Sequence, residues 1–593
     1  MRATVRLRHT TRAVSHVRRQ KNKGLKVTKP NQRQALSAVR QIPGIQHAAR
    51  IVAFYGASRL DPEKSMPSPN DLEAASQHAG GRVLEEATQA LLELSPKARL
   101  TAIDELMASN HGRHEQWLPK APAKRFAEFF DNASSVRCSF EASLHTALLL
   151  AMQGKAVLFV AQNKDICNFA QSLAVLLECK LQVQFADPLA RTDTTKFEAE
   201  VAFPPFGSKP MNTGQIPRRT LAILDAEEGK KRLTEDVLAL ADALAQSTGQ
   251  TILCVPDGLM YRGVGVEPLA REALVASGRL KGVLAVPGGM IFPNTMMDTD
   301  VLVLTSSNMD GSKVRMLDLS HPSFSGRTVR GRPEILPGTN WARYLEESTA
   351  NDETFAKDVS LEEIKEKDFI LSINRYLLPP AAVALEGFLE RSRTIELQDA
   401  VELIRPLSLG KAEDGEFTIF EASPADVSQH GLLTQPHKIS TLERAQMRKA
   451  RNQRLLPGDV ILSVKGTIGT AGLVPADAPT SDEDGFWTAG QSFMILRPKH
   501  GGVSGVVLYE YLANPTVVEA LRTLAGGSAI QSIAIKDLKA FRVPIPSEEE
   551  AERAELTFKR RQERHAQIEE IMAEIEAERT SSWPSRELNL EKP

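Results

Sequence analysis

The residues of this chain that are best placed to do chemistry form a short, rigid corner: Phe203, Pro204, Pro205 and Phe206. Val201 and Ala202 before it are typical of the end of a buried strand, and the prolines cannot extend a sheet because they have no N–H group to donate. Ligands bind just outside the carboxyl ends of the strands in open α/β sheets, so the corner is a candidate site. A turn without any further function is the alternative.

A second candidate group is a basic loop between residues 441 and 454, which contains a single acidic residue, Glu443. Its cations are Arg444, Arg448, Lys449, Arg451 and Arg454. Contacts from such side chains to phosphates position a protein on DNA, whereas contacts to base edges select the sequence. The loop, together with Lys465 in the glycine-containing stretch that follows, is therefore a candidate surface for double-stranded DNA.

The corner resembles the Asn/Asp-Pro-Pro-Phe/Tyr motif of DNA amino-methyltransferases, and Gly207 matches the form found in modification subunits of type I restriction-modification systems. Residues 271–295, 300–305 and 361–376 are similar to three further stretches of that family, in the same order. The resemblance implies an N-6 DNA methylase that uses S-adenosylmethionine. It also implies that a base is flipped out of the duplex and stacked on the aromatic side chain of the corner, here Phe206.

The corner departs from the family at its first position. Family enzymes hold the amino group of the target base through the carbonyl oxygen of the leading Asn or Asp and through the carbonyl of the first proline. Phe203 stands at the leading position, and a phenyl ring has no acceptor to offer. A flipped base could still stack on Phe206, but methyl transfer would lack its main polar contact.

The positions that should bind the cofactor have changed as well. The family's Asp-Pro-x-x-Gly-Ser-Gly turn aligns with residues 138–144, where both glycines and the leading Asp are absent and Leu144 would intrude on the cofactor. Gln162 replaces the acidic residue that holds the ribose hydroxyls, whereas Asp187 matches the acidic residue near the adenine amino group. The resemblance thus implies these cofactor-binding positions: Ala142, Ser143, Gln162 and Asp187.

Two independent sites have lost the residue types that their chemistry needs. The sequence therefore predicts a pseudoenzyme, a DNA-binding methyltransferase-like protein that works without methyl transfer in a prokaryotic restriction-modification or defence complex. Its cofactor would be S-adenosylmethionine if it is active and none if it is not. One alternative is an active, site-specific DNA adenine-N6 methyltransferase whose motifs have drifted, and another is a scaffold that binds only proteins.

The elements that must position the corner alternate between strands and helices. Strands are expected at residues 156–161, 181–186 and 197–202, with helices at 144–152 and 166–177. Strands separated by helices of about ten residues predict a mostly parallel sheet. The predicted α/β fold has its methyltransferase-like Rossmann core at residues 131–378, after a helical region at 61–130.

The last part of the chain is predicted to be an α+β domain that ends in a long helix. Residues 395–546 are rich in strand patterns, and residues 458–469 resemble part of a target-recognition domain of type I specificity subunits, which reads bases in a DNA groove. A small β module that docks on its own protein is the alternative. Residues 547–580 begin with a capping box and carry one apolar stripe, which predicts packing against a partner subunit, a second copy or the chain's own domain.

Bulk properties set the remaining limits. The 593 residues are too many for one core, so three or four domains are expected, and the net charge of −1 favours no class of partner. Residues 1–60 contain fourteen Lys and Arg but no Asp or Glu, which favours a disordered basic arm over an arm that contacts phosphates.

No apolar run approaches the roughly 18 residues of a membrane span. Four cysteines without a C-x-x-C pair argue against zinc and for a reducing cytoplasm.

Overall fold

A computed structural model describes residues 48–62, 81–108, 117–191, 196–226, 232–263, 265–308, 313–327, 332–346, 355–410, 415–482, 485–526 and 531–588. The chain divides into two compact units, Met1–His111 with Asn168–Glu178, and Gly112–Cys167 with Cys179–Pro593. Among the described residues, none of the helices combines the length and the apolar character that crossing a membrane requires.

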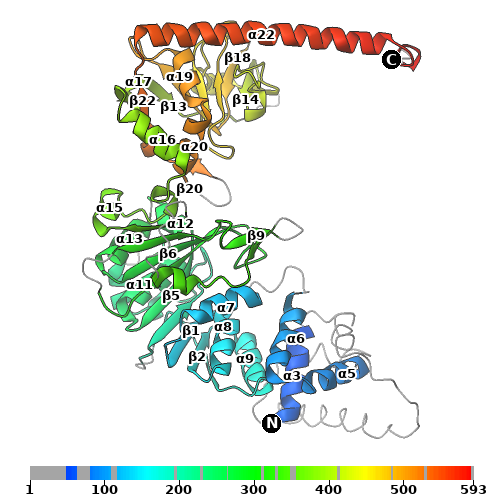
Figure 1. The fold of residues 1–593 in the computed structure, drawn as a ribbon, viewed down its shortest axis with the longest axis vertical. Helices are drawn as coiled ribbons and strands as arrows, with labels where there is room; N and C mark the ends of the chain where they lie inside the picture. The colour runs from blue at the N-terminus through cyan, green and yellow to red at the C-terminus, as the bar shows by residue number, and fades with distance from the viewer. Residues whose placement is uncertain are drawn as a thin grey trace. The chain divides into compact units, whose positions relative to one another are not determined.

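The smaller unit is helical. It contains α3 Ala48–Leu60, α5 Gly81–Leu92, α6 Pro96–Ala108 and most of α9 Lys164–Leu176 (Figure 1). The predicted disordered arm at residues 1–60 is wrong for its last part, because α3 buries Ile51 and Val52 completely or nearly so. Apolar side chains at helical spacing outweigh the basic residues there. The rest of that arm, residues 1–47, lies outside the described residues.

A nine-stranded sheet forms the core of the larger unit, in the order β11-β8-β6-β7-β5-β4-β1-β2-β3. The strands are β1 Ser135–Ser139, β2 Ala156–Ala161, β3 Leu181–Phe185, β4 Ala199–Ala202, β5 Gln250–Pro256, β6 Leu280–Val286, β7 Thr299–Leu304, β8 Val314–Asp318 and β11 Ala356–Val359. Strands β3, β2, β1, β4 and β5 are parallel neighbours, as are β6 and β8, whereas β7 is antiparallel to β5 and β6, and β11 to β8. The predicted mostly parallel sheet is confirmed.

Helices connect these strands and follow them in the chain. They are α7 Lys120–Glu128, α8 Leu144–Met152, α9 Lys164–Leu176, α10 Arg218–Ile223, α11 Glu235–Gln246, α12 Gly258–Tyr261, α13 Glu267–Ala276, α14 Trp341–Glu346 and α15 Leu361–Glu366. A two-stranded ribbon adds β9 Ser325–Arg327 and β10 Pro333–Ile335. Strand β4 lies between β1 and β5, so both of its edges are paired, and the residues that follow it lie at the carboxyl ends of the parallel strands.

The C-terminal part has its own apolar cores. The apolar core of the sheet region includes Leu377, and the next apolar core begins with Ala382 in α16. One core therefore ends and another begins on either side of Pro379 and Pro380. Two sheets form this part, β13-β19-β16-β17 and β15-β14-β18. Their strands are β13 Val401–Ile404, β14 Phe417–Ala422, β15 Lys438–Leu442, β16 Val460–Ser463, β17 Ala471–Leu473, β18 Phe486–Ala489 and β19 Phe493–Pro498.

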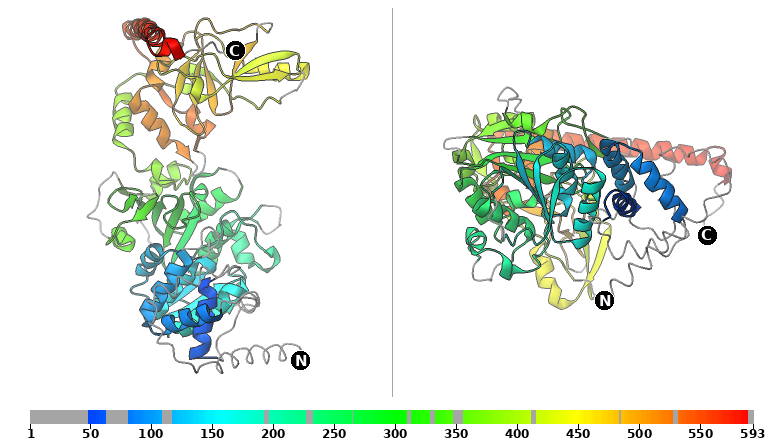
Figure 2. Two further views of the ribbon diagram at one scale, coloured as in Figure 1. Left: turned by 90° about the vertical axis from the view of Figure 1, so that its right-hand side faces the viewer. Right: turned by 90° about the horizontal axis from the view of Figure 1, so that it is seen from below.

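Helices and short ribbons complete this α+β part, as predicted. They are α16 Pro380–Leu389, β12 Thr394–Glu396, α17 Leu397–Ala400, α18 Arg444–Asn452, α19 Gly505–Leu512, α20 Pro515–Thr523, β20 Ala525–Gly526, β21 Ser532–Ile533, α21 Ile535–Lys539, β22 Arg542–Pro544, α22 Glu548–Ser581 and α23 Ser585–Leu588. Helix α22 begins with the predicted capping box and is one straight helix of 34 residues, drawn in red and viewed nearly along its axis in the left panel of Figure 2.

Candidate functional site

The Pro-Pro corner follows β4 directly, as predicted, but its first side chain is turned into the protein. Phe203 is 3% exposed. Its ring lies edge-on to Phe126 of α7, with 4.7 Å between the ring centroids, and 6.5 Å from the ring of Phe292. Phe126 in turn packs edge-on against Trp341 at 5.7 Å. The side chain at the leading position of the corner therefore contributes to an aromatic cluster and offers no polar atom to a ligand.

The other end of the corner is less enclosed. Pro204 is buried, Pro205 and Phe206 are half-buried, and Phe206 meets Phe292 edge-on at 5.6 Å. Gly207 adopts a left-handed φ of 65° that a side chain would strain. Phe206 thus keeps part of an aromatic face accessible, next to a turn that requires glycine.

The corner is anchored to the start of α11. The backbone N–H of Gly207 donates to Asp236 Oδ2 at 3.3 Å, and the N–H of Glu235 donates to the carbonyl of Ser208 at 2.9 Å. These two hydrogen bonds fix the segment after the prolines to the first turn of α11.

The turn after β1 keeps a glycine-like conformation without a glycine. Phe140 has φ 71° and ψ 158°, a region that almost only glycine adopts and that costs about 1–3 kcal/mol for another residue. The predicted cofactor positions Ala142 and Ser143 lie in the short 3-10 helix that follows, and the Ser143 hydroxyl donates to the Phe140 carbonyl at 2.7 Å. Leu144 begins α8 and is buried. Side chains therefore fill the turn where the family has glycines.

The other two predicted cofactor positions already have intramolecular partners. The Gln162 amide donates to Glu235 Oε1 at 3.4 Å, and Asp187 Oδ1 accepts the N–H of Leu189 at 2.9 Å. Glu141 likewise accepts the N–H of the residue after Gln162 at 3.0 Å. Gln162 and Asp187 follow β2 and β3, so the structure brings the ends of these strands to the same edge as the corner.

Glu235 is the titratable group that this cluster perturbs most. Burial raises the pKa of Glu235 to about 7; the hydrogen bond from Gln162 opposes the shift, while the charges of Asp187, Glu141 and Asp236 add to it. Sequence patterns did not single out Glu235, because an acidic residue in the first turn of a helix is ordinary.

We expect Glu235→Gln to stabilise the protein at pH 8 but not at pH 4.5. The native state holds a proton on Glu235 up to a pKa of about 7 and the unfolded state only to about 4.5, so stability falls as pH rises through this window. A rise in pKa from 4.5 to about 7 makes the cost of ionising Glu235 at pH 8 on the order of 3 kcal/mol, and glutamine removes it. Denaturation at both pH values measures the difference, with Glu272→Gln on the exposed face of α13 as the control. Equal pH profiles for wild type and Glu235→Gln would refute this.

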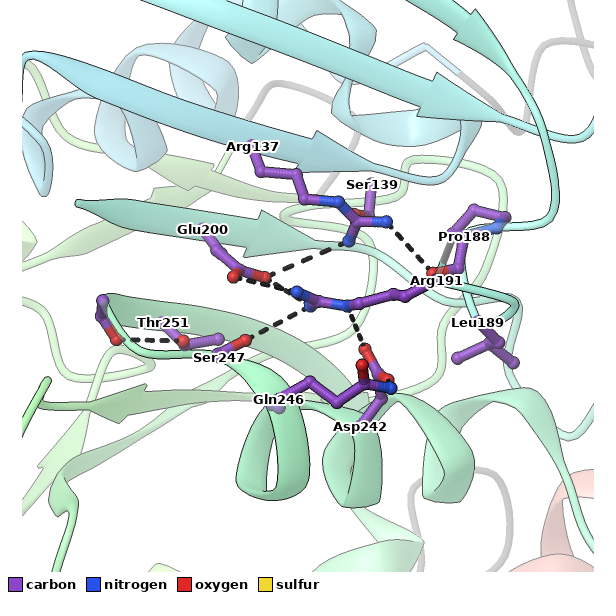
Figure 3. A network of polar contacts seen from close by, with 12 residues as sticks. Arg137, Ser139, Pro188, Leu189, Arg191, Glu200, Asp242, Gln246, Ser247 and Thr251 are labelled. Carbon is purple, nitrogen blue, oxygen red and sulfur yellow. Dashed lines mark hydrogen bonds and ion pairs between the residues drawn. The ribbon is translucent and has the colours of Figure 1, made fainter. Parts of the chain in front are cut away.

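A buried ion-pair network supports the corner from β4 (Figure 3). Arg191, in the loop after β3, donates to both carboxylate oxygens of Glu200, to Asp242 Oδ2 at 2.6 Å and to the Ser247 hydroxyl at 3.2 Å. All three charged side chains are at least nine-tenths buried. Burial opposes the ionisation of Glu200, but Arg191 outweighs it and holds the pKa of Glu200 below its ordinary value, whereas burial dominates at Asp242 and raises its pKa.

Arg137 of β1 extends this network. It donates to the Ser139 hydroxyl at 2.6 Å and to the Pro188 carbonyl at 3.1 Å, and it lies 4.0 Å from Glu200. Strands β1 and β4, helix α11 and the loop that carries Asp187 are thereby joined through buried charges (Figure 3). The network holds in place the segments on which the predicted base and cofactor positions lie.

The predicted basic loop is wrong as a loop: most of it is helix α18. Glu443 caps the helix together with Gln446, and Met447 and Ala450, three residues apart, face a small core. Burial of these two side chains explains why the segment is helical despite its charge. The opposite side of the helix is exposed and carries three of the predicted cations without an ion-pair partner in the described chain: Arg444, Arg448 and Lys449.

The remaining predicted cations are placed differently. Arg451 Nε donates to Asp482 Oδ2 at 2.8 Å, and Arg454 pairs with the same carboxylate while its guanidinium lies 4.2 Å from the centroid of the Phe486 ring. Lys465 is exposed in the loop between β16 and β17, which belongs to the other sheet and is bridged to Ser532. The structure thus groups five of the six predicted DNA contacts, and two of these five are already neutralised.

Comparison with known families gives two matches, in separate parts of the chain. Residues 173–382 match the model of the N-6 DNA methylase family, and residues 432–579 match that of the type I restriction modification DNA specificity domain. No curated protein matches the sequence.

Solved structures of related systems are similar at low identity. The methyltransferase subunit of a type I restriction-modification system from Streptococcus thermophilus is 20% identical, with 50% of this chain and 68% of that chain covered and a TM-score of 0.42. The S subunit of such a system from M. genitalium is 20% identical, with 31% and 44% covered and a TM-score of 0.21. The type IIL restriction-modification enzyme MmeI, in complex with DNA, is 8% identical, with 88% of each chain covered and a TM-score of 0.45. At these identities and TM-scores the similarity carries no conclusion about activity, substrates or partners.

Proposed function

We propose that this chain, in which an N-6 DNA methylase domain is fused to a type I restriction-modification DNA specificity domain, binds duplex DNA without methylating it. The methyltransferase-like domain is assigned to residues 131–378 and the target-recognition domain to 395–546. The protein would act in a prokaryotic restriction-modification or defence complex, where DNA recognition rather than methyl transfer is its contribution.

The position of Phe203 carries this proposal. Methyl transfer to an exocyclic amine requires acceptors that hold the amine and direct its lone pair, and the leading residue of the corner normally supplies one. The side chain of Phe203 is buried beside Phe126 and Phe292 and has no acceptor atom in any rotamer, so it cannot replace the leading Asn or Asp side chain. The first-proline carbonyl alone would remain.

The residues at the cofactor positions do not fit S-adenosylmethionine. Backbone can approach the methionine part of that molecule only where Cβ atoms are missing, and the turn here contains Phe140, Ala142 and Leu144 instead. Gln162, at the ribose position, is hydrogen-bonded to Glu235. We therefore assign no step of a reaction to the cofactor.

An active adenine-N6 methyltransferase is the second candidate, and specific residues favour it. Pro204, Pro205 and Phe206 follow β4 in the order that base stacking requires, and Asp187 is present after β3. In that case S-adenosylmethionine would be the cofactor, and methyl transfer would proceed without an acceptor from the side chain of Phe203.

Titration of the purified full chain with S-adenosylmethionine, followed by a radiolabel assay for N6-methyladenine on unmodified duplex DNA, separates the two candidates. We expect no heat of binding at micromolar ligand and no label. Label that appears with the wild type and disappears with Phe206→Ala would establish the active enzyme and refute this part of the proposal.

A second copy of the chain is the proposed partner of helix α22. Its distal half exposes apolar side chains by 53–60% at helical spacing: Ile568, Ile571, Met572 and Ile575. The segment before this stripe is basic at 559–564 and the segment along it is acidic at 569–578, so an antiparallel pair would place opposite charges together. Sedimentation at rising protein concentration tests this; a strictly monomeric chain contradicts it.

A further inference from the structure

The cations of helix α18 fall into two classes. Arg444, Arg448 and Lys449 point to solvent, whereas Arg451 and Arg454 share the carboxylate of Asp482. Asp482 lies 28 residues beyond Arg454 in the chain, in the connection between β17 and β18. The basic character of this surface is therefore reduced by one acidic residue that reaches it from a different segment.

The two paired arginines are held with unequal strength. Arg454 is 21% exposed, donates to the Thr480 carbonyl and lies over the Phe486 ring, so it keeps partners even without Asp482. Arg451 is 54% exposed, and the carboxylate of Asp482 is the partner that the described structure gives it. Arg451 is thus the cation whose availability to another anion depends most on Asp482.

A carboxylate held by two guanidinium groups occupies the place that a phosphate oxygen pair would take. Arginine binds carboxylates and phosphates through the same planar arrangement of N–H donors. Asp482 and a DNA phosphate would therefore compete for Arg451, and the negative charge of Asp482 would also repel the phosphate.

We propose that Asp482 is an internal competitor for phosphate that lowers the affinity of α18 for the DNA backbone. This rests on the proposed DNA binding by the domain. Phosphate contacts are independent of base sequence, so restraining one of them lowers binding to every sequence by the same factor and leaves the ratio of affinities between sequences unchanged. Asp482 would then set the overall affinity for DNA, while base contacts set the discrimination between sequences.

Fluorescence anisotropy of the full chain with a random-sequence duplex, over a range of salt concentrations, tests the proposal. Asp482→Asn keeps the shape of the side chain and removes its charge. We expect about three- to tenfold tighter binding at low salt and a salt dependence steeper by roughly 0.9, the value for one additional phosphate contact. Asp477→Asn is the matched control, because Asp477 is exposed in the same connection and has no ion pair in the described structure. It should change affinity less than twofold.

Arg451 supplies a second measurement that does not depend on how well Asp482→Asn folds. In the wild-type background Arg451→Ala should weaken binding much less than Arg448→Ala, although both remove one arginine from the same helix. In the Asp482→Asn background Arg451→Ala should abolish the gain.

The outcomes separate this proposal from the one on which it rests. Equal affinities for Asp482→Asn and Asp477→Asn, a loss of affinity in Asp482→Asn, or a gain that survives Arg451→Ala would each overturn the role of Asp482 while DNA binding stands. Absence of salt-dependent DNA binding in the wild type and in every variant would instead overturn the proposed DNA binding, and the role of Asp482 with it.

Discussion

Replacing Arg191 by methionine is expected to lower the free energy of unfolding of the methyltransferase-like domain by about 3–5 kcal/mol. The change leaves the carboxylates of Glu200 and Asp242 buried without their cation, and Arg137, 4.0 Å from Glu200, is too far to replace its hydrogen bonds. Methionine keeps most of the volume of the side chain, so the loss reports the charge rather than a cavity. Denaturant unfolding followed by circular dichroism measures it.

Arg219→Met is the matched control for this experiment. Arg219 lies on α10, is exposed and bonds to Gln246, one turn from Asp242 on α11. Because surface contacts of this kind contribute little, its replacement should cost less than about 1 kcal/mol. Equal effects of the two substitutions would show that the network is not a support of the fold.

The pH dependence distinguishes a charge effect from a packing effect. In Arg191→Met the two buried carboxylates lose the cation that hydrogen-bonds to both, so their pKa values should rise and protonation should remove the buried charge. The deficit relative to the wild type should therefore shrink as the pH falls from 8 toward 5. A deficit that is constant over this range would indicate lost packing.

Sequence patterns predicted the sheet and the corner because both depend on local signals. Apolar runs of strand length, separated by helices, predicted the parallel strands β2, β3 and β4, and two consecutive prolines can only end β4. The same patterns missed α3 and α18. In each case the number of charges suggested a solvated segment, while a few apolar residues, such as Met447 and Ala450, decide the structure by being buried.

The ion pairs could not be predicted from the sequence. Arg191 and Asp242 are 51 residues apart, and Arg451 and Asp482 are 31 apart, with no local pattern that connects either pair. Their contact depends on how strands and loops are arranged in three dimensions. Charge counting therefore overstated the number of free cations near residue 450, since the acidic partner lies in another segment.

The double substitution Arg448→Ala with Lys449→Ala should weaken binding to duplex DNA by about 10- to 100-fold near 0.1 M salt, equally for all sequences. Both side chains are exposed on α18, and neither has an ion-pair partner in the described chain. Loss of two phosphate contacts should also reduce the slope of log K against log salt by about 1.8, because each contact contributes about 0.9. Anisotropy measurements at several salt concentrations give both quantities.

The control for this substitution is Arg391→Ala with Arg393→Ala, which removes the same charge from exposed positions after α16 in the same part of the chain. Its effect should be no more than a few-fold, because charges beyond a screening length of about 10 Å at 0.1 M salt act weakly on a phosphate. If the α18 variant kept the wild-type affinity and slope, α18 would not face DNA. Equal losses in both variants would show that binding depends on net charge alone. If α18 is a defined contact surface, removing two cations from α18 must cost more affinity than removing two cations elsewhere.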